Sequence, residues 1–226
     1  MLVRISFSKH GVIKYIGHLD LMRYFQKAFR RTDINVLYSK GFSPHMIMSF
    51  AQPLGVGIES DKEYFDVEVF DDEDVTLFPS KLNEEMADGI VVLDAVKMPE
   101  KTKNAMASVA AADYEITFFK NNPLSDSLLE KYKNNESVTY TKTTKTGDHS
   151  INVKDFVFDF DIINENILFI KCDASSAGNL KPKSFVTALL SLEDKNAEDY
   201  PIHVLRKDLY KYDSKGNLVS LNNIDE

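Results

Sequence analysis

The spacing of apolar and polar residues predicts a strand followed by a helix at the start of the chain. Apolar and polar positions alternate from Leu2 to Ile16, which is typical of a strand with a turn at Gly11. The next segment, His18–Arg31, contains no Gly or Pro. Its apolar residues recur at helical spacing and predict a buried face made of Leu21, Phe25, Ala28 and Phe29.

The same patterning continues to the end of the first half. It predicts strands over 35–38, 46–50 and 64–70, a helix over 76–88 and a strand over 90–96. Residues 46–50 are expected to form a short strand or an extended segment, since Pro44 biases the preceding Ser43 away from helix. The resulting order, β-α-β-β-α-β, is that of the split βαβ or ferredoxin-like motif.

The second half repeats this order. Strands are expected over 114–119, 138–144, 153–160, 167–173 and 202–212, and helices over 125–133 and 182–192. We therefore expect an α+β protein built from two tandem ferredoxin-like (βαββαβ) units. The units would span residues 1–98 and 113–226, and the polar run that begins at Pro99 would provide a linker over 99–112.

Composition indicates a folded protein outside the membrane. The chain has 226 residues, 43% of them hydrophobic, which is enough for a sizeable core. No apolar run approaches the ~18 residues of a membrane-spanning helix, and the first residues resemble a strand more than a signal peptide, so we expect a cytoplasmic protein. The single cysteine, Cys172, lies in an apolar run and is expected to be buried, which leaves no cysteine pair or cysteine-held iron–sulfur cluster within the chain.

Charge is unevenly distributed. The net charge is -8, yet residues 1–50 carry eight Lys and Arg against two acids, which leaves 19 basic and 33 acidic residues in the remainder. This asymmetry predicts one face that attracts an anion on an otherwise acidic body, although a chance excess on a solvated face is the alternative. The carboxylates between Glu59 and Glu68 are expected to form a solvated face.

The basic residues cluster on the first helix and in the turn that follows the second strand. Arginine and lysine bind phosphates, and exposed aromatic rings stack on unpaired bases, so this region is a candidate surface for RNA or a phosphorylated ligand. Tyr15, Tyr24 and Tyr38 are interleaved with the basic residues, and packing into the core is the alternative for Tyr24 and Tyr38. The candidate ligand-binding residues are Arg23, Lys27, Arg30, Arg31, Lys40, Phe42, Ser43 and His45.

Two histidines are candidates for catalysis. His18 and His45 could act as acid and base in metal-free RNA cleavage, or His18 could cap the helix and His45 orient the turn. The spacings typical of zinc sites are missing from the sequence, and Gly55-Val-Gly57 lacks the third glycine of a dinucleotide fingerprint. We therefore expect no metal and no cofactor.

The segments GHLDLMRYFQKAFRR, YSKGFSPHMIMSFAQPLGVGIES and EYFDVEV resemble a bacterial domain of unknown function that is fused to, or encoded beside, radical S-adenosylmethionine proteins. A weaker echo of that family is present in NLKPKSFVTALL and RKDLYKYD. The resemblance implies a stand-alone form whose partner is a separate radical enzyme, because this chain lacks a cysteine triad. The tandem order also looks like that of the repeat-associated RNA-processing (RAMP) proteins of CRISPR systems, which is a similarity of fold alone.

Three hypotheses follow. The leading one is an accessory module without activity of its own that holds an RNA, a tRNA or rRNA, for a radical enzyme that modifies it. The second is a metal-independent endoribonuclease or transferase that uses His18 and His45. The third is an adaptor whose basic helix docks on an acidic partner protein. We expect neither DNA nor a membrane as a partner.

Overall fold

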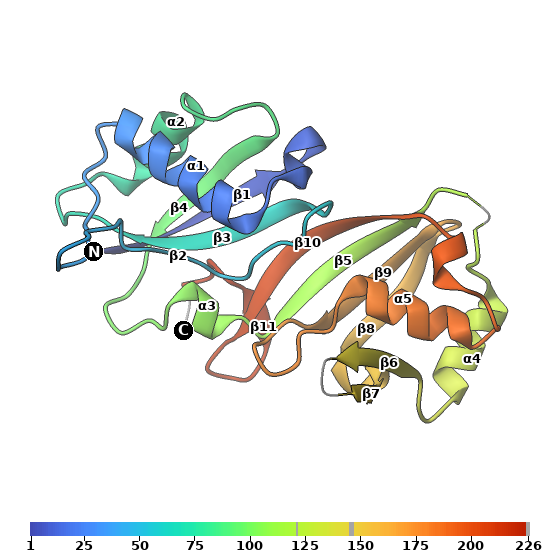
Figure 1. Ribbon diagram of the computed structural model, residues 1–226. Helices are drawn as coiled ribbons and strands as arrows, with labels where there is room; N and C mark the ends of the chain where they lie inside the picture. The colour runs from blue at the N-terminus through green and yellow to red at the C-terminus, as the bar shows by residue number, and fades with distance from the viewer. Residues whose placement is uncertain (121, 145–146, 225–226) are drawn as a thin grey trace. The chain divides into compact units, whose positions relative to one another are not determined.

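The protein has an α+β fold, as expected from the sequence. The computed structural model describes residues 1–120, 122–144 and 147–224. The chain forms two compact units (Figure 1). Unit 1 comprises Met1–Ala110 together with Arg206–Glu226, and unit 2 comprises Ala111–Leu205.

Unit 1 has the strand order of a ferredoxin-like motif. Its antiparallel strands follow the order β4-β1-β3, and the short β2 pairs with the end of β3. In the same sheet β10 is the next neighbour of β3, and β11 pairs with β10. The elements of unit 1 are β1 (Leu2–Lys9), the 3₁₀ helix η1 (Gly11–Tyr15), α1 (His18–Arg31), β2 (Met48–Phe50), β3 (Glu59–Glu68), the 3₁₀ helix η2 (Val75–Leu77), α2 (Phe78–Asn83), β4 (Ile90–Lys97), α3 (Ala105–Ser108), β11 (Leu218–Ser220) and β10 (Ile202–Tyr212) from Arg206 onward.

The core of unit 1 lies between this sheet and α1. The helix occupies the residues that its periodicity predicts, His18–Arg31, and buries the four apolar side chains expected on one face. Phe25 packs against Phe7 of β1 and Phe65 of β3, with ring centroids 4.9 and 4.7 Å apart. Edge-to-face and tilted aromatic pairs of this kind add to the stabilisation from burial. The basic side of α1 is therefore fixed outward by its packing.

The other face of the unit 1 sheet is polar but buried. Arg4 of β1 is fully buried and donates to both carboxylate oxygens of Asp66 on β3, at 2.7 and 3.1 Å. Its guanidinium also donates to the carbonyl oxygen of Leu221, while Asp66 accepts from the amide of Ala105 at the start of α3. The expectation that the β3 carboxylates are solvated was wrong for Asp66 and for Glu63, because α3 and the residues after β11 cover this face and Arg206 engages Glu63.

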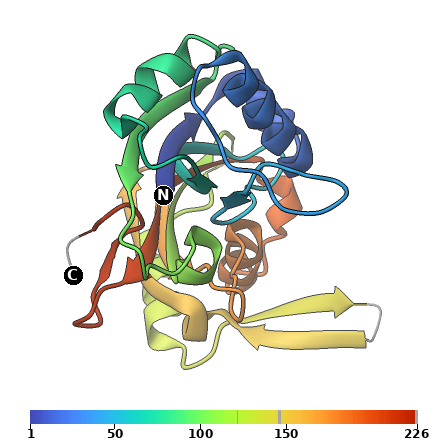
Figure 2. The same cartoon turned by 90° about the vertical axis from the view of Figure 1, so that its left-hand side faces the viewer.

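Unit 2 repeats the ferredoxin-like order. Its strands follow the order β10-β5-β9-β8, and β10 contributes Ile202–Leu205 to this unit. An additional two-stranded ribbon, β6–β7, is inserted between α4 and β8 and projects from the unit (Figure 2). The elements are β5 (Ala111–Phe118), α4 (Asp126–Asn134), β6 (Thr139–Thr144), β7 (Gly147–Asn152), the 3₁₀ helix η3 (Val153–Phe156), β8 (Val157–Asn164), β9 (Ile167–Asp173), α5 (Pro182–Ser191) and the 3₁₀ helix η4 (Ala197–Asp199).

The unit boundaries differ from the expected division into 1–98 and 113–226 at the end of the chain. The last residues of β10 and all of β11 group with unit 1. Within unit 1, the buried Arg206 donates through Nε to Glu63 of β3 at 2.6 Å and through Nη1 to Gln52 at 2.7 Å. Because a buried charge is stable only with its partners, these bonds attach β10 to β3.

Candidate functional site

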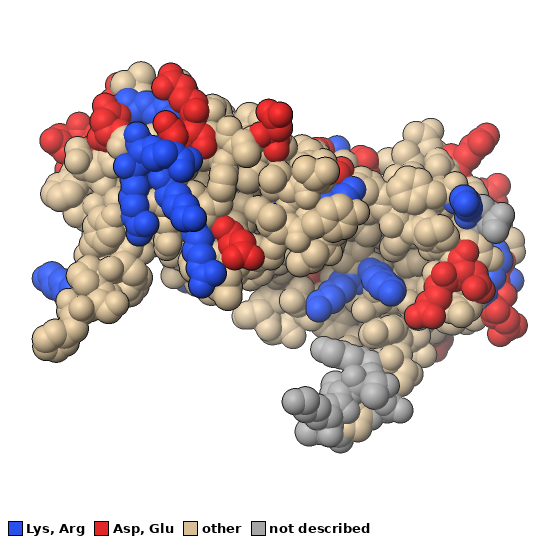
Figure 3. Space-filling view, turned by 45° about the horizontal axis from the view of Figure 1, so that its top comes forward, with Lys and Arg blue, Asp and Glu red and all other residues tan. Residues whose placement is uncertain are grey.

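Three cations form a stripe along the outer side of α1. Arg23, Lys27 and Arg30 are separated by four and three residues, which places them on one side of a helix, and all three are exposed. Figure 3 shows a band of Lys and Arg side chains over the region of α1, with Asp and Glu beside it. We call Arg23, Lys27 and Arg30 the basic stripe.

The basic stripe is only weakly neutralised within the protein. Arg23 lies 3.5 Å from Asp20, and both side chains are about two-thirds exposed, at 66% and 69%. An exposed pair of this kind contributes about 0–1 kcal/mol and is screened by salt. Among the described residues, Lys27 and Arg30 make no ion pair. Three cations are therefore available to a ligand from one helix face.

The fourth arginine of the predicted surface has a structural partner. Arg31 forms an ion pair with the Glu85 side chain, and its Nη2 donates to the Glu85 carbonyl oxygen at 3.1 Å. These contacts attach the end of α1 to the segment that follows α2. Arg31 is consequently less available for a ligand than the basic stripe.

The segment 39–45 is an exposed loop closed at its base. Ser39 donates its amide to the His45 carbonyl oxygen at 2.8 Å, and the His45 amide donates to Ser39 Oγ at 3.1 Å. The imidazole Nδ1 of His45 lies 2.9 Å from the same Ser39 hydroxyl. Lys40, Ser43 and a fully exposed Phe42 form the tip of the loop. His45 thus closes the loop, while the tip presents a cation and an aromatic ring.

A groove of about 220 Å³ lies between the end of α1 and Tyr38 and Met46, the residues that flank this loop. Buried Phe29, Ile34, Val36 and Met46 contribute apolar walls, and Arg30 of the basic stripe lies at its side; Thr32, Asn35, Tyr38 and Phe70 complete the lining. Tyr38 and Phe70 remain 44% and 51% exposed. Exposed aromatic rings next to a guanidinium provide the two components of single-stranded RNA binding, base stacking and phosphate attraction.

The groove is negatively charged at one end. Glu73 accepts from the backbone amide and the side-chain amide of Asn35, at 2.8 Å each. A phosphate is therefore favoured on the Arg30 side and disfavoured next to Glu73. Phe70 was not predicted as a site residue, because its position fits the alternation of the strand expected over 64–70. Its place directly before the acidic loop 71–74 was the one indication in the sequence that its ring could be exposed.

The two histidines proposed for catalysis have separate environments. The His18 ring packs edge-on against Phe50, with centroids 5.3 Å apart, and burial lowers its pKa below the ordinary value. His18 begins α1, whereas His45 adjoins Met46 at the groove beside the other end of the helix. Arg30 comes twelve positions after His18 along the helix, or roughly 18 Å at ~1.5 Å per residue. No contact between described residues joins the two rings.

The positive excess of the first 50 residues is only partly a surface property. Arg4 and Lys9 are buried, and Lys9 donates to the carbonyl oxygens of Lys14 and Ile16 at 3.4 and 3.1 Å. Lys14 pairs with Glu59 at 3.1 Å. The cations left for a ligand are therefore the basic stripe and Lys40, and the candidate surface is smaller than the count of charges indicates.

An exposed apolar patch adjoins the first turn of α1. Val12 and Tyr15 of η1 are 79% and 66% exposed, and Leu19 of α1 is 60% exposed. Val56 is also exposed, and the loop that carries it is attached to η1 by a hydrogen bond from the Gly57 amide to the Lys14 carbonyl oxygen, 2.9 Å long. Leu19 precedes Arg23 by four residues, so Leu19 and the basic stripe lie along one side of α1.

Comparison with known proteins places the chain in a family. Residues 3–182 match the model of the family described as "Uncharacterized protein conserved in bacteria (DUF2344)", and the chain belongs to that family. No curated protein matches the sequence. None of the helices in the described residues is long and apolar enough to cross a membrane. Within the same residues, no group of three or more His, Cys, Asp or Glu side chains is placed to hold a metal ion.

Proposed function

We propose that this protein is an RNA-binding module that presents an RNA, a tRNA or rRNA, to a separate radical S-adenosylmethionine enzyme. The observation that carries the proposal is the continuity of the basic stripe with the groove at Arg30, where Tyr38 and Phe70 expose their rings. Cations at helical spacing follow a phosphate backbone, and the rings accept unpaired bases. A radical enzyme is proposed as the partner because GHLDLMRYFQKAFRR and the following segments resemble a family that is associated with such enzymes. Such a module would act in the cytoplasm.

The exposed apolar patch supports a docking role beside RNA binding. Val12, Tyr15, Leu19 and Val56 are exposed at the start of α1, where they provide apolar area for a partner protein. The basic stripe lies farther along the same helix face. A protein held on the patch would thus be next to an RNA held on the stripe. A purely protein-docking adaptor remains the alternative, and it would use the patch without any nucleic acid.

The ribonuclease alternative depends on His18 and His45 acting together. His18 packs on Phe50 and His45 bonds to Ser39, so each ring has a structural role of its own. Under the RNA-presenting proposal, neither the unchanged protein nor the variant with both histidines replaced by alanine cleaves RNA. Loss of an RNA-cleaving activity in that double variant would instead support the enzyme alternative.

Salt-dependent RNA binding tests the proposal. Each phosphate contact contributes a slope of about -0.7 to the plot of log affinity against log salt for a single strand, so three contacts give a slope of about -2. Affinity for an unstructured RNA should therefore fall about 20-fold between 50 and 200 mM salt. Fluorescence anisotropy of a labelled RNA with the purified chain provides the measurement.

The matched variants reverse equal numbers of charges. Changing Arg23, Lys27 and Arg30 to Glu should abolish binding. Lys101, Lys133 and Lys215 are exposed and lie outside the candidate surface. Changing these three lysines to Glu should reduce RNA binding only slightly. Equal losses in the two triple variants would show that net charge alone governs binding and would overturn the proposal. A complex with the radical enzyme that persists after nuclease treatment and is lost on changing Leu19 and Val56 to Ser would support docking through the patch.

A further inference from the structure

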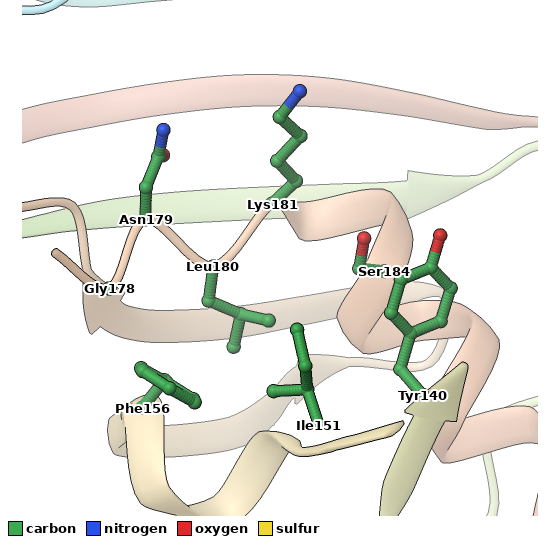
Figure 4. A pocket seen from close by; sticks show the side chains of 8 residues that line it. All are labelled: Tyr140, Ile151, Phe156, Gly178, Asn179, Leu180, Lys181 and Ser184. Carbon is green, nitrogen blue, oxygen red and sulfur yellow. The ribbon is translucent and has the colours of Figure 1, made fainter. Parts of the chain in front are cut away.

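Unit 2 contains a pocket that is separate from the groove of unit 1. Its volume is about 170 Å³. An engineered cavity of about 150 Å³ holds a benzene molecule, so this pocket has room for one ring system. It is lined by Tyr140, Ile151, Phe156, Gly178, Asn179, Leu180, Lys181 and Ser184 (Figure 4).

The pocket has an apolar side and a polar side. Leu180 is buried and lies toward Ile151 and Phe156, while the polar ends of Tyr140, Ser184, Asn179 and Lys181 point to the opposite side (Figure 4). Among the described residues, the hydroxyls of Tyr140 and Ser184 and the ammonium of Lys181 have no hydrogen-bond partner. These three groups are therefore free to bind a ligand that rests on the apolar side.

The walls of the pocket are built before any ligand arrives. Tyr140 and Ile151 are directly opposite each other in the β6–β7 ribbon, so their side chains share one face. The loop between β9 and α5 is closed by hydrogen bonds from the Leu180 amide to the Asp173 carbonyl oxygen, 2.9 Å, and from the Ser175 amide to the Asp173 carboxylate, 2.7 Å.

The tight loop also needs a glycine at position 178. A Cβ there would lie 2.3–2.6 Å from the carboxylate of Asp173, so the Asp173 side chain or the loop would have to shift. The following residue, Asn179, has a positive φ of 48°. The backbone around the mouth of the pocket is therefore constrained, and a constrained wall loses little conformational entropy when a ligand binds.

The geometry points to a nucleoside monophosphate as the ligand of this pocket. We propose that one base rests on Leu180, Ile151 and Phe156. A hydroxyl both donates and accepts, so Tyr140 and Ser184 suit the mixed donor and acceptor groups on the edge of a base. Lys181 at the rim supplies the positive charge for the phosphate. The nucleotide is either free or a single unpaired residue of an RNA, since both present the same base, ribose and phosphate.

This site goes beyond the proposed function of unit 1. Its residues all belong to unit 2, and it shares no residue with the basic stripe or with the groove at Arg30. Failure of RNA binding on α1 would leave the pocket proposal standing, and failure of the pocket would leave the basic stripe unaffected. The triple Glu variant of the basic stripe should bind a mononucleotide as well as the unchanged protein does.

Titration of the full chain with the four ribonucleoside 5′-monophosphates, followed by amide NMR, tests the proposal. At least one should produce saturable shifts at Tyr140, Leu180 and Ser184. Lys181→Met should weaken this binding about tenfold or more, because a hydrogen bond to a charged phosphate is lost. Lys183→Met is the matched control, since Lys183 is an exposed lysine of α5 outside the pocket lining, and it should have no effect.

Further titrations and a pocket-filling variant identify the source and the chemical class of the ligand. An RNA trinucleotide that binds the same residues more tightly than any monophosphate would identify RNA as the source, and equal or weaker binding would identify the free nucleotide. Ser184→Leu, which fills the pocket, should abolish binding of either. Saturable shifts with benzoate or ribose 5-phosphate alone, shifts confined to other residues, or no shift with any mononucleotide would overturn the proposal.

Discussion

Removing the buried guanidinium of Arg4 should destabilise unit 1 strongly. Arg4 is fully buried, with 0% of its surface exposed to solvent, and its partner Asp66 is 2% exposed. Arg4→Met removes the two bonds to Asp66 and the 2.7 Å bond to the Leu221 carbonyl oxygen. It leaves a buried carboxylate whose remaining bond is to the Ala105 amide, 2.6 Å. Breaking a buried pair from one side costs about 3–5 kcal/mol.

Hydrogen exchange measures this cost within one unit. Amides of β1 (Leu2–Lys9) should exchange about two to four orders of magnitude faster in Arg4→Met, which corresponds to the expected loss of free energy of unfolding. Arg23→Met is the matched control, because the exposed pair with Asp20 contributes about 0–1 kcal/mol. Amides of β9 (Ile167–Asp173) in unit 2 provide an internal reference.

The double variant Arg4→Met/Asp66→Leu distinguishes the cost of an unpaired buried carboxylate from the cost of lost packing. Replacing both members of a buried pair with apolar residues avoids the unpaired carboxylate, so β1 should exchange more slowly than in Arg4→Met alone. A change of less than about 1 kcal/mol in the single variant would show that the Arg4–Asp66 pair contributes no more than an exposed pair does. A double variant as unstable as the single one would show that packing, and not the buried charge, sets the cost.

Two further predictions concern the pocket loop and the first turn of α1. Gly178→Ala should destabilise unit 2 by about 1–3 kcal/mol, measured by hydrogen exchange, because the added Cβ meets the Asp173 carboxylate. Gly17→Ala is the control and should cost less, because its Cβ meets nothing within 4 Å. Equal costs would contradict the steric argument. Burial lowers the pKa of His18 in the folded state, so the unfolded chain takes up the proton first and stability falls as the pH drops through the ordinary value of 6.5. His18→Gln should flatten the pH dependence of stability between about pH 7 and 5, and an unchanged slope would contradict the assignment.

The order of elements could be predicted because it depends on local patterns. The helix His18–Arg31 has one apolar face over fourteen residues without Gly or Pro, and the structure places α1 over those same residues. The ferredoxin-like order of both units follows from the alternation of strand and helix patterns. Local periodicity decides each of these features, and distant parts of the chain alter them little.

The burial of polar residues could not be predicted in the same way. Alternation along β3 places Asp66 and Phe65 on opposite faces, but it does not show that a second layer covers the polar face. That layer comes from α3 and from residues near Leu221, which are distant in the sequence. The candidate site had the same limitation: charges on α1 could be found by helical spacing, whereas the groove that combines Arg30 with Phe70 depends on tertiary packing.

Photochemical cross-linking of RNA to the protein identifies the side chains that touch the RNA. An unstructured RNA that contains 4-thiouridine forms covalent bonds only with side chains in direct contact, and mass spectrometry identifies them. We predict cross-links at Tyr38, Phe70 or the exposed Phe42 of unit 1, which decrease as salt rises and disappear when the basic stripe is reversed to Glu. Cross-links that avoid all three rings, or that persist in the reversed variant, would contradict RNA binding at this surface.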